Sequence, residues 1–219
     1  MPTFHIRPGS VAAGDPERLL DNFDSQLPWL ATKGSGGQWG STRRGDKADK
    51  QEEYRAKVKR SETYVDQPLS QDWIRTYIAE VEARAEDLDP EIRKLSSTEV
   101  DGRGQVRVPV AGMVLDAKSA DYVRSILPER DEEDPFVYLH YLLSDRRTSS
   151  IGKGAGAALI AHAKEELRKL GVERMCCDCW RGNDRRLVSY YETQGFKAIG
   201  DFGPEETDSW LGTVLEMRL

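Results

Sequence analysis

Cysteines, long apolar runs and excess positive charge are all missing or scarce in this chain of 219 residues, and each shortage excludes a class of protein. The three cysteines lie together in "MCCDCW", where strand neighbours would point to opposite faces, so we expect reduced thiols and no disulfide framework. No apolar run approaches the roughly 20 residues that span a bilayer, which argues against a membrane protein. The net charge of −6 argues against general nucleic-acid binding, because the average field repels phosphate.

The composition that remains is that of a globular protein, with 38% hydrophobic and 32% charged residues. The opening "MPTFHIRPGS" has no apolar core of a secretory signal, so we expect a cytoplasmic location. The length suits a single domain over residues 1–219, as a monomer or a homodimer.

Strand and helix patterns alternate along the chain, which predicts an α/β (α+β) sandwich of helices on one twisted sheet. A stripe formed by Trp73, Ile74, Tyr77, Ile78 and Val81 predicts a helix over residues 70–81. A charged stretch around 41–68 predicts a solvated loop or exposed helix, inserted between the first two helices. Other helices are expected from Asp15, from Ala155 to Leu170 and over 184–194, and strands over 3–8, 105–115, 136–143, 172–180, 196–202 and 209–219.

The stretch "SSIGKGAGAALI" places Gly152, Gly154 and Gly156 at alternate positions directly before an apolar helical pattern. Glycines let successive amide groups converge on one point, and a helix that begins there adds unpaired N–H donors and a positive dipole end. The turn is therefore suited to a pyrophosphate.

Several kinds of site could contain a turn of this type. A nucleotide P-loop is excluded because Lys153 is followed by glycine and not by Ser or Thr. A dinucleotide fingerprint fits Gly152, Gly154 and Ala157, with Asp178 at the end of the next strand, but "SDRRTSS" separates the preceding strand from the first glycine. A glycine-rich helix entry without a ligand also fits this pattern, and so does an acetyl-coenzyme A site.

Two linked motifs carry a family resemblance. "IGKGAGAALI" resembles the pyrophosphate loop of the GNAT N-acetyltransferases, and "NDRRLVSYYETQGF" resembles that family's second signature at nearly the usual distance downstream. The chain departs from the family at Ile151, where Arg or Gln is usual, and at Asn183, which lies one residue farther than usual from Gly195. The resemblance implies a mixed, mostly antiparallel twisted sheet of six to seven strands, splayed between the fourth and fifth strands.

The resemblance also implies acetyl-CoA as cosubstrate and transfer of its acetyl group to a primary amine, by direct attack in a ternary complex. Tyr191 stands at the position of the family's general acid, and the N–H of Leu142 or Leu143 would stabilise the oxyanion. The implied cofactor-binding residues are Leu142, Leu143, Ser144, Ile151, Gly152, Lys153, Gly154, Ala155, Gly156, Asn183 and Tyr191.

The acceptor side is less defined. An alkylamine has a pKa of about 10.4 and must lose a proton before it attacks. Candidate bases are Glu132, Glu133, Asp134, His140 and Asp178. Asp178 interrupts an apolar strand, so it either attracts the cationic acceptor or has a structural partner such as an arginine. The same resemblance implies that Trp29, Gln38 and Trp39 contact the acceptor. Because the protein is acidic, we expect the acceptor to be a cationic small molecule.

A coenzyme A-binding regulatory or scaffold module without catalysis is the alternative function, and an NAD(P)-binding protein is a further one. No metal is expected, because Cys177 and Cys179 have no nearby His or Cys cluster to complete a tetrahedral zinc site.

Overall fold

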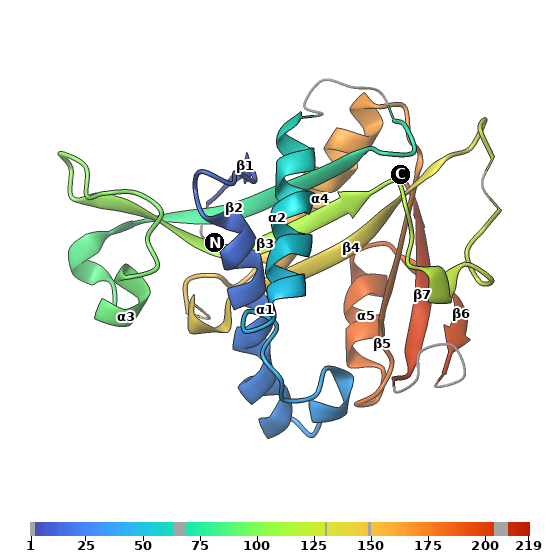
Figure 1. The fold of residues 1–219 in the computed structure, drawn as a ribbon, viewed down its shortest axis with the longest axis horizontal. Helices are drawn as coiled ribbons and strands as arrows, with labels where there is room; N and C mark the ends of the chain where they lie inside the picture. Colours follow the sequence, from blue (N-terminus) through green and yellow to red (C-terminus); the bar gives the residue numbers. More distant parts are fainter. Residues whose placement is uncertain (1–2, 64–68, 130, 149, 204–209) are drawn as a thin grey trace.

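A seven-stranded sheet runs through the molecule, with strand order β1-β2-β3-β4-β5-β7-β6 (Figure 1). The structure is a computed structural model and describes residues 3–63, 69–129, 131–148, 150–203 and 210–219. Among the strands of the described residues, β4 and β5 pair in parallel and all other neighbours are antiparallel, as the family resemblance implies. The strands are β1 (Phe4–Pro8), β2 (Ile74–Arg84), β3 (Gln105–Asp116), β4 (Phe136–Ser144), β5 (Arg174–Trp180), β6 (Lys197–Phe202) and β7 (Gly212–Arg218).

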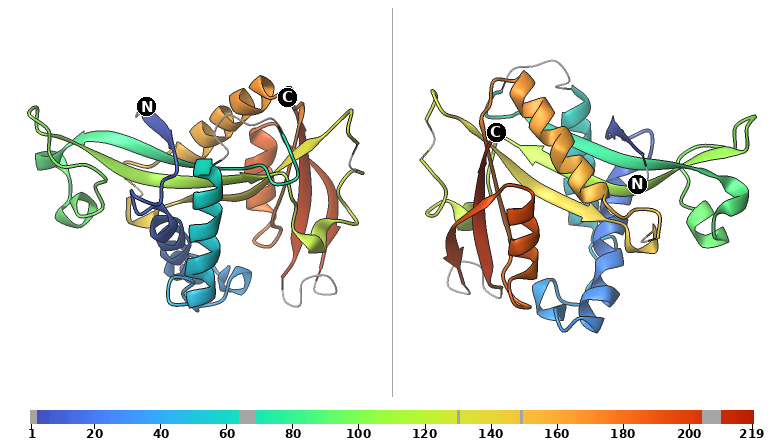
Figure 2. Two further views of the ribbon diagram at one scale, coloured as in Figure 1. Left: turned by 45° about the horizontal axis from the view of Figure 1, so that its top comes forward. Right: turned by 180° about the vertical axis from the view of Figure 1, so that it is seen from behind.

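Helices cover both faces of the sheet (Figure 2). The first face carries α1 (Asp15–Thr32) and α2 (Ala48–Thr63), and the opposite face carries α4 (Ala155–Lys169) and α5 (Arg186–Thr193). The short elements are α3 (Pro90–Arg93) and the 3₁₀ turns η1 (Gly36–Gln38), η2 (Ala85–Asp87), η3 (Asp121–Val123) and η4 (Arg146–Thr148). No helix in the described ranges is long and apolar enough to cross a membrane.

The helix predicted over residues 70–81 is wrong, because this segment forms β2. Trp73 and Tyr77 pack into the core under α4, whereas Ile74 and Ile78 pack into the core under α1 and α2. A central strand buried on both faces is apolar at nearly every position, so its two-residue alternation disappears and a helical spacing can be read into it.

The charged stretch around 41–68 supplies α2 itself, apart from residues 64–68, which lie outside the described residues. Tyr54 and Val58 of α2 are buried against β2 and α1, while the charged positions face outward. The sparse apolar stripe is sufficient because α2 buries only one narrow face.

The helix α1 begins at Asp15, where the sequence predicts it. Gly14 occupies the cap position, and Asp15 is the first helical residue. The fully buried Asp15 carboxylate accepts hydrogen bonds from the Ser10 amide at 2.8 Å and from Arg7. The helix continues past Pro28 to Thr32.

Candidate active site

The parallel pair β4–β5 is closed at one end and open at the other. Its register runs from Phe136 opposite Arg174 to Leu139 opposite Cys177 and then stops. Beyond that point β4 continues to pair with β3, and β5 continues to pair with β7. The predicted splay between the fourth and fifth strands is therefore present, and it leaves one edge of β4 without a strand partner in the described part of the chain.

Backbone directions show which groups line this open edge. The Asp145 amide donates to the Val110 carbonyl of β3 at 2.8 Å, and backbone groups alternate sides along a strand. The N–H and C=O of Leu142 and Ser144 therefore point toward β5, and those of Leu143 point toward β3. The Ser144 carbonyl already accepts a hydrogen bond from the Gln26 side chain of α1.

The glycine turn is held by a buried scaffold at the end of β4. The Asp145 carboxylate is 3% exposed and pairs with Arg147 at 2.7 Å. Thr148 donates its hydroxyl to the Asp145 carbonyl at 2.9 Å and accepts the Gly152 amide at its own carbonyl, also at 2.9 Å. These bonds fix the path of the chain between β4 and α4.

Close contacts and backbone shape explain the glycines themselves. A Cβ on Gly152 would lie 3.1 Å from Cβ of Val110, and one on Gly156 would lie 3.0 Å from the Tyr190 hydroxyl. Gly154 has a φ of +98°, which side-chain-bearing residues rarely adopt. The backbone conformation therefore favours glycine at position 154, and the space for a side chain is tight at positions 152 and 156.

The turn ends at the first residue of α4, Ala155. The Ala155 amide bonds to the Gly152 carbonyl, whereas no acceptor in the described ranges bonds to the amides of Gly156 and Ala157. Together with the helix dipole these amides make an anion-binding position beside the open edge of β4.

Tyr191 of α5 lies on the same face of the sheet as α4. It is 7% exposed, and its ring packs at 5.4 Å from that of Phe196. Burial raises its pKa well above the ordinary value, so the phenol keeps its proton. No described group hydrogen-bonds the hydroxyl. Asn183 begins a run of three residues with φ of 55–57° before α5, and its contact with a cofactor stays a prediction.

Asp178 lies on the opposite face from Tyr191. Its neighbours Cys177 and Cys179 pack into the core with Tyr191, so the intervening side chain points the other way. Tyr138 of β4 and Tyr122 of η3 both donate hydrogen bonds to its carboxylate, the latter at 3.2 Å. Burial raises the pKa of Asp178, and the two hydrogen bonds oppose that rise. Its structural partners are tyrosines and not the arginine considered from the sequence.

His140 is an extra residue in β4 where the strand bulges. Leu139 pairs with Leu115 and Tyr141 with Val114, which leaves His140 unmatched on β3. Its Nε2 lies 2.9 Å from the Lys118 carbonyl, an acceptor, so Nε2 carries the hydrogen and the neutral ring keeps Nδ1 as a proton acceptor. Desolvation, followed by repulsion from Lys57, lowers the pKa of His140.

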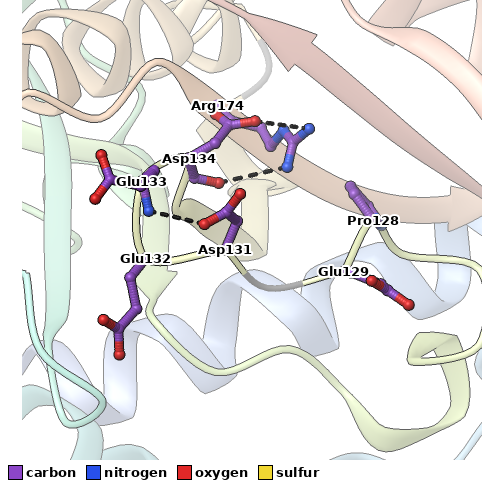
Figure 3. A pocket seen from close by; sticks show the side chains of 7 residues that line it. All are labelled: Pro128, Glu129, Asp131, Glu132, Glu133, Asp134 and Arg174. Atoms are coloured by element: carbon purple, nitrogen blue, oxygen red, sulfur yellow. Dashed lines mark hydrogen bonds and ion pairs between the residues drawn. The ribbon is translucent and has the colours of Figure 1, made fainter.

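The other three candidate bases lie at the closed end of the strand pair. Glu132, Glu133 and Asp134 line an open pocket of about 620 Å³ with Arg174, shown in Figure 3. Asp134 pairs with Arg174 at 2.9 Å and with Arg218 at 2.8 Å, which gives it a structural role. This pocket is separated from the splay by roughly 15 Å of strand, at about 3.3 Å per residue.

The three residues expected on the acceptor side lie at and after the end of α1. Trp29 is 37% exposed, and the Arg146 guanidinium lies 3.6 Å from the centre of its ring. Trp39 packs against Phe23 at 4.4 Å, and Gln38 belongs to η1. Figures 1 and 2 place η1 beside one end of α5, so this segment borders the open side of the strand pair.

Sequence reasoning missed Gln26, Tyr122 and Tyr138. Gln26 is 4% exposed among the apolar residues of α1, and a polar residue inside such a stripe was an available signal. The two tyrosines come from separate elements and meet Asp178 only in the folded chain. No group of three or more His, Cys, Asp or Glu within the described residues is arranged to hold a metal ion.

A twisted mixed sheet with helices on both faces defines an α/β fold, and in this protein the sheet opens between β4 and β5. No protein-family model and no curated protein matches the chain. Solved structures do match it. A GNAT-family acetyltransferase from Listeria monocytogenes 4b F2365 has a TM-score of 0.57 and 16% identity, over 99% of this chain and 95% of that one.

Two further matches extend over almost the whole length of both chains. The PaiA N-acetyltransferase from Thermoplasma acidophilum, solved in complex with coenzyme A, has a TM-score of 0.55 and 15% identity over 99% of each chain. The ribosomal-protein-alanine N-acetyltransferase from Brucella melitensis has a TM-score of 0.54 and 16% identity over 98% of this chain and 99% of that one. The protein therefore has the GNAT acetyltransferase fold. The described sheet is mostly antiparallel, so it differs from the doubly wound parallel sheet in which a dinucleotide fingerprint normally lies.

Proposed function

We propose that this protein is an N-acetyltransferase that moves an acetyl group from acetyl-CoA to a primary amine of a small molecule. The observation that carries the proposal is the open edge of β4 at Leu142, which directly adjoins a glycine turn with unpaired amides at Gly156 and Ala157. An extended ligand with amide groups and a pyrophosphate matches both features. The coenzyme A complex of a protein with the same fold supports this match.

The residues of the turn fit the cosubstrate by their shape and their donors. Gly152, Gly154 and Gly156 keep side chains away from the amides, and α4 contributes its positive end. Ile151 contributes through its backbone in this arrangement. The pantetheine arm pairs with the Leu142 groups, since the Ser144 carbonyl is engaged by Gln26.

The reaction forms one C–N bond and breaks one C–S bond. The amine lone pair attacks the thioester carbonyl carbon, the Leu142 N–H stabilises the negative charge that develops on the carbonyl oxygen, and the thiolate departs. Tyr191 supplies the proton that the sulfur needs, because its raised pKa keeps the phenol protonated until charge develops on the leaving group. The proton of the amine passes to a base.

Two residues near the open end of the strand pair act on the acceptor, one by attracting it and the other by accepting its proton. The Asp178 carboxylate attracts the ammonium form of the acceptor to the face opposite Tyr191. His140 accepts the amine proton at Nδ1, directly or through water, since its lowered pKa keeps the ring neutral near pH 7.

Turnover and cofactor binding, measured separately, test the proposal. Release of the coenzyme A thiol is followed with a chromogenic disulfide over a panel of primary amines, and coenzyme A affinity is measured by thermal shift. Tyr191→Phe is expected to lower kcat by about 100-fold or more while coenzyme A affinity stays unchanged. Tyr77→Phe is the matched control, because it also removes the hydroxyl of a buried tyrosine, one that donates to Glu166 of α4.

A chain that is stabilised by coenzyme A but releases no thiol with any amine would be a coenzyme A-binding module without catalysis. Equal activity of wild type and Tyr191→Phe would remove Tyr191 from the mechanism. Stabilisation by NAD or NADP and not by coenzyme A would contradict the assignment of the glycine turn.

A further inference from the structure

Arg44 lies in the segment between η1 and α2 and is fixed there by α1. The Asp24 carboxylate is 8% exposed and accepts the backbone amides of Arg44 at 2.7 Å and Gly45 at 3.0 Å. The guanidinium carbon of Arg44 lies 3.7 Å from the centre of the Phe23 ring, whose ring in turn packs on Trp39. The half-buried side chain thus has a defined place next to residues expected on the acceptor side.

Three elements surround this guanidinium. Burial, the largest effect, raises the pKa of Tyr54 in α2, Tyr122 in η3 and Tyr141 in β4, and the positive charge of Arg44 opposes that rise in all three. Tyr122 is also a hydrogen-bond donor to Asp178. The contacts with Asp24 and Phe23 of α1 place Arg44 on the face of the sheet that α1 and α2 cover, which is also the face of Asp178.

No carboxylate in the described ranges pairs with Arg44. Asp24 is used by the two backbone amides and by Arg43 at 3.4 Å, and Glu53 pairs with Lys50 and Lys57. The half-buried guanidinium carries five donors, and its described side-chain partner is the neutral hydroxyl of Tyr54, so no anion balances its charge. Asp178 is its counterpart, an acid whose described side-chain partners are neutral hydroxyls.

Asp178 and Arg44 thus have no ionic partner among the described residues. Arg146 beside Trp29 also pairs with no described carboxylate, but its guanidinium donates to the Gln26 side chain at 2.7 Å. We propose that Arg44 binds a carboxylate of the acceptor, so that the substrates are amines which also carry a carboxylate, α-amino acids above all. A guanidinium suits this task because its planar fork matches the two oxygens of a carboxylate. The inference rests on the proposed acetyl transfer and adds its substrate class.

Paired acceptors test this inference. Thiol release is measured with L-methionine, L-phenylalanine, L-glutamate and L-lysine, with the carboxamide of each at its α-carboxylate, and with spermidine, glucosamine and tryptamine, which lack a carboxylate. The wild type is expected to prefer an acid over its own amide by about 10- to 100-fold in kcat/KM, the size of a hydrogen bond to a charged group. Arg44→Gln should remove that preference by slowing the acid while the amide changes less than about threefold.

Arg55→Gln is the matched control, since it removes the same charge from an exposed position on α2 that pairs with Glu17 of α1. It should keep the preference. Equal losses on acid and amide in Arg44→Gln would make Arg44 structural and overturn the inference. If Arg44→Gln no longer shows a thermal shift with coenzyme A, the variant is not informative about the acceptor. The test then rests on the wild type, in which an acid-to-amide ratio near one in kcat/KM would overturn the inference.

The inference and the proposed function fail in different ways. Transfer only to spermidine, glucosamine or tryptamine overturns the substrate class and leaves acetyl transfer standing. If none of the acceptors causes thiol release, both the substrate class and the proposed acetyl transfer are overturned.

Discussion

Replacing Asp178 with asparagine probes the acceptor side with little change of shape. The side chain keeps its size, loses its charge and exchanges one acceptor oxygen for an NH₂ donor. The carboxylate of the wild type accepts hydrogen bonds from Tyr138 and Tyr122, so one hydroxyl loses its acceptor in the variant. An unsatisfied buried hydroxyl costs about 1–3 kcal/mol, partly offset because a neutral amide is cheaper to bury than a charge.

The effect on activity follows from the lost attraction for the ammonium group. A hydrogen bond to a charged group contributes about 1.5–3 kcal/mol, so kcat/KM for the acceptor should fall roughly 10- to 150-fold. Coenzyme A affinity should change less than about twofold, because the glycine turn and Tyr191 are separated from Asp178 by the sheet.

Steady-state thiol release and thermal unfolding measure both quantities in the same preparations. Glu133→Gln is the matched control, since it removes the same charge at the closed end of the strand pair (Figure 3). An unchanged kcat/KM in Asp178→Asn would show that this carboxylate does not attract the acceptor. An equal loss in Glu133→Gln would show that net charge, and not this carboxylate, attracts the acceptor.

Three further perturbations have defined outcomes. In the wild type kcat/KM for the acceptor should rise with pH through a step below pH about 6.5, the ordinary histidine pKa, because desolvation lowers the pKa of His140 and the base acts unprotonated. Persistence of this step in His140→Gln would exclude His140 as the base. Gly154→Ala forces a side-chain-bearing residue to a φ of +98° and should destabilise the turn by about 1–3 kcal/mol in chemical unfolding, with weaker coenzyme A binding, whereas unchanged binding would separate the turn from the cofactor. Tyr122→Phe removes a hydrogen bond that lowers the pKa of Asp178, so an infrared carboxyl titration should show a higher midpoint than in the wild type, and a lower one would contradict the assigned contact.

Local patterns predicted most of the sheet and the glycine turn. The alternation in β3, the apolar run of β4 and the glycine stop after α4 are each encoded within about ten residues of sequence. β2 was misread because Trp73 and Ile74 are both buried, on opposite faces, so neighbouring apolar positions carried no period of two. Edge strands retain that period, and central strands lose it.

The acceptor side depended on contacts that no local pattern contains. Tyr122 and Asp178 are separated by 56 positions, and their hydrogen bond exists only after η3 folds over β5. Arg44 belongs to a run of charged residues that resembles a solvated surface, and its place beside Phe23 follows from the Asp24 clamp. The glycine turn and Tyr191 could be singled out from the sequence because their spacing is local, and their roles in binding and catalysis stay predictions.

Amide chemical shifts of the ¹⁵N-labelled chain, followed during titration with coenzyme A, report where the cosubstrate binds. We expect the largest changes at Leu142 on the open edge of β4 and at Gly156 and Ala157 at the start of α4, with small changes at the acidic pocket around Glu132. Changes confined to other surfaces, or none at saturating coenzyme A, would contradict the proposed coenzyme A site.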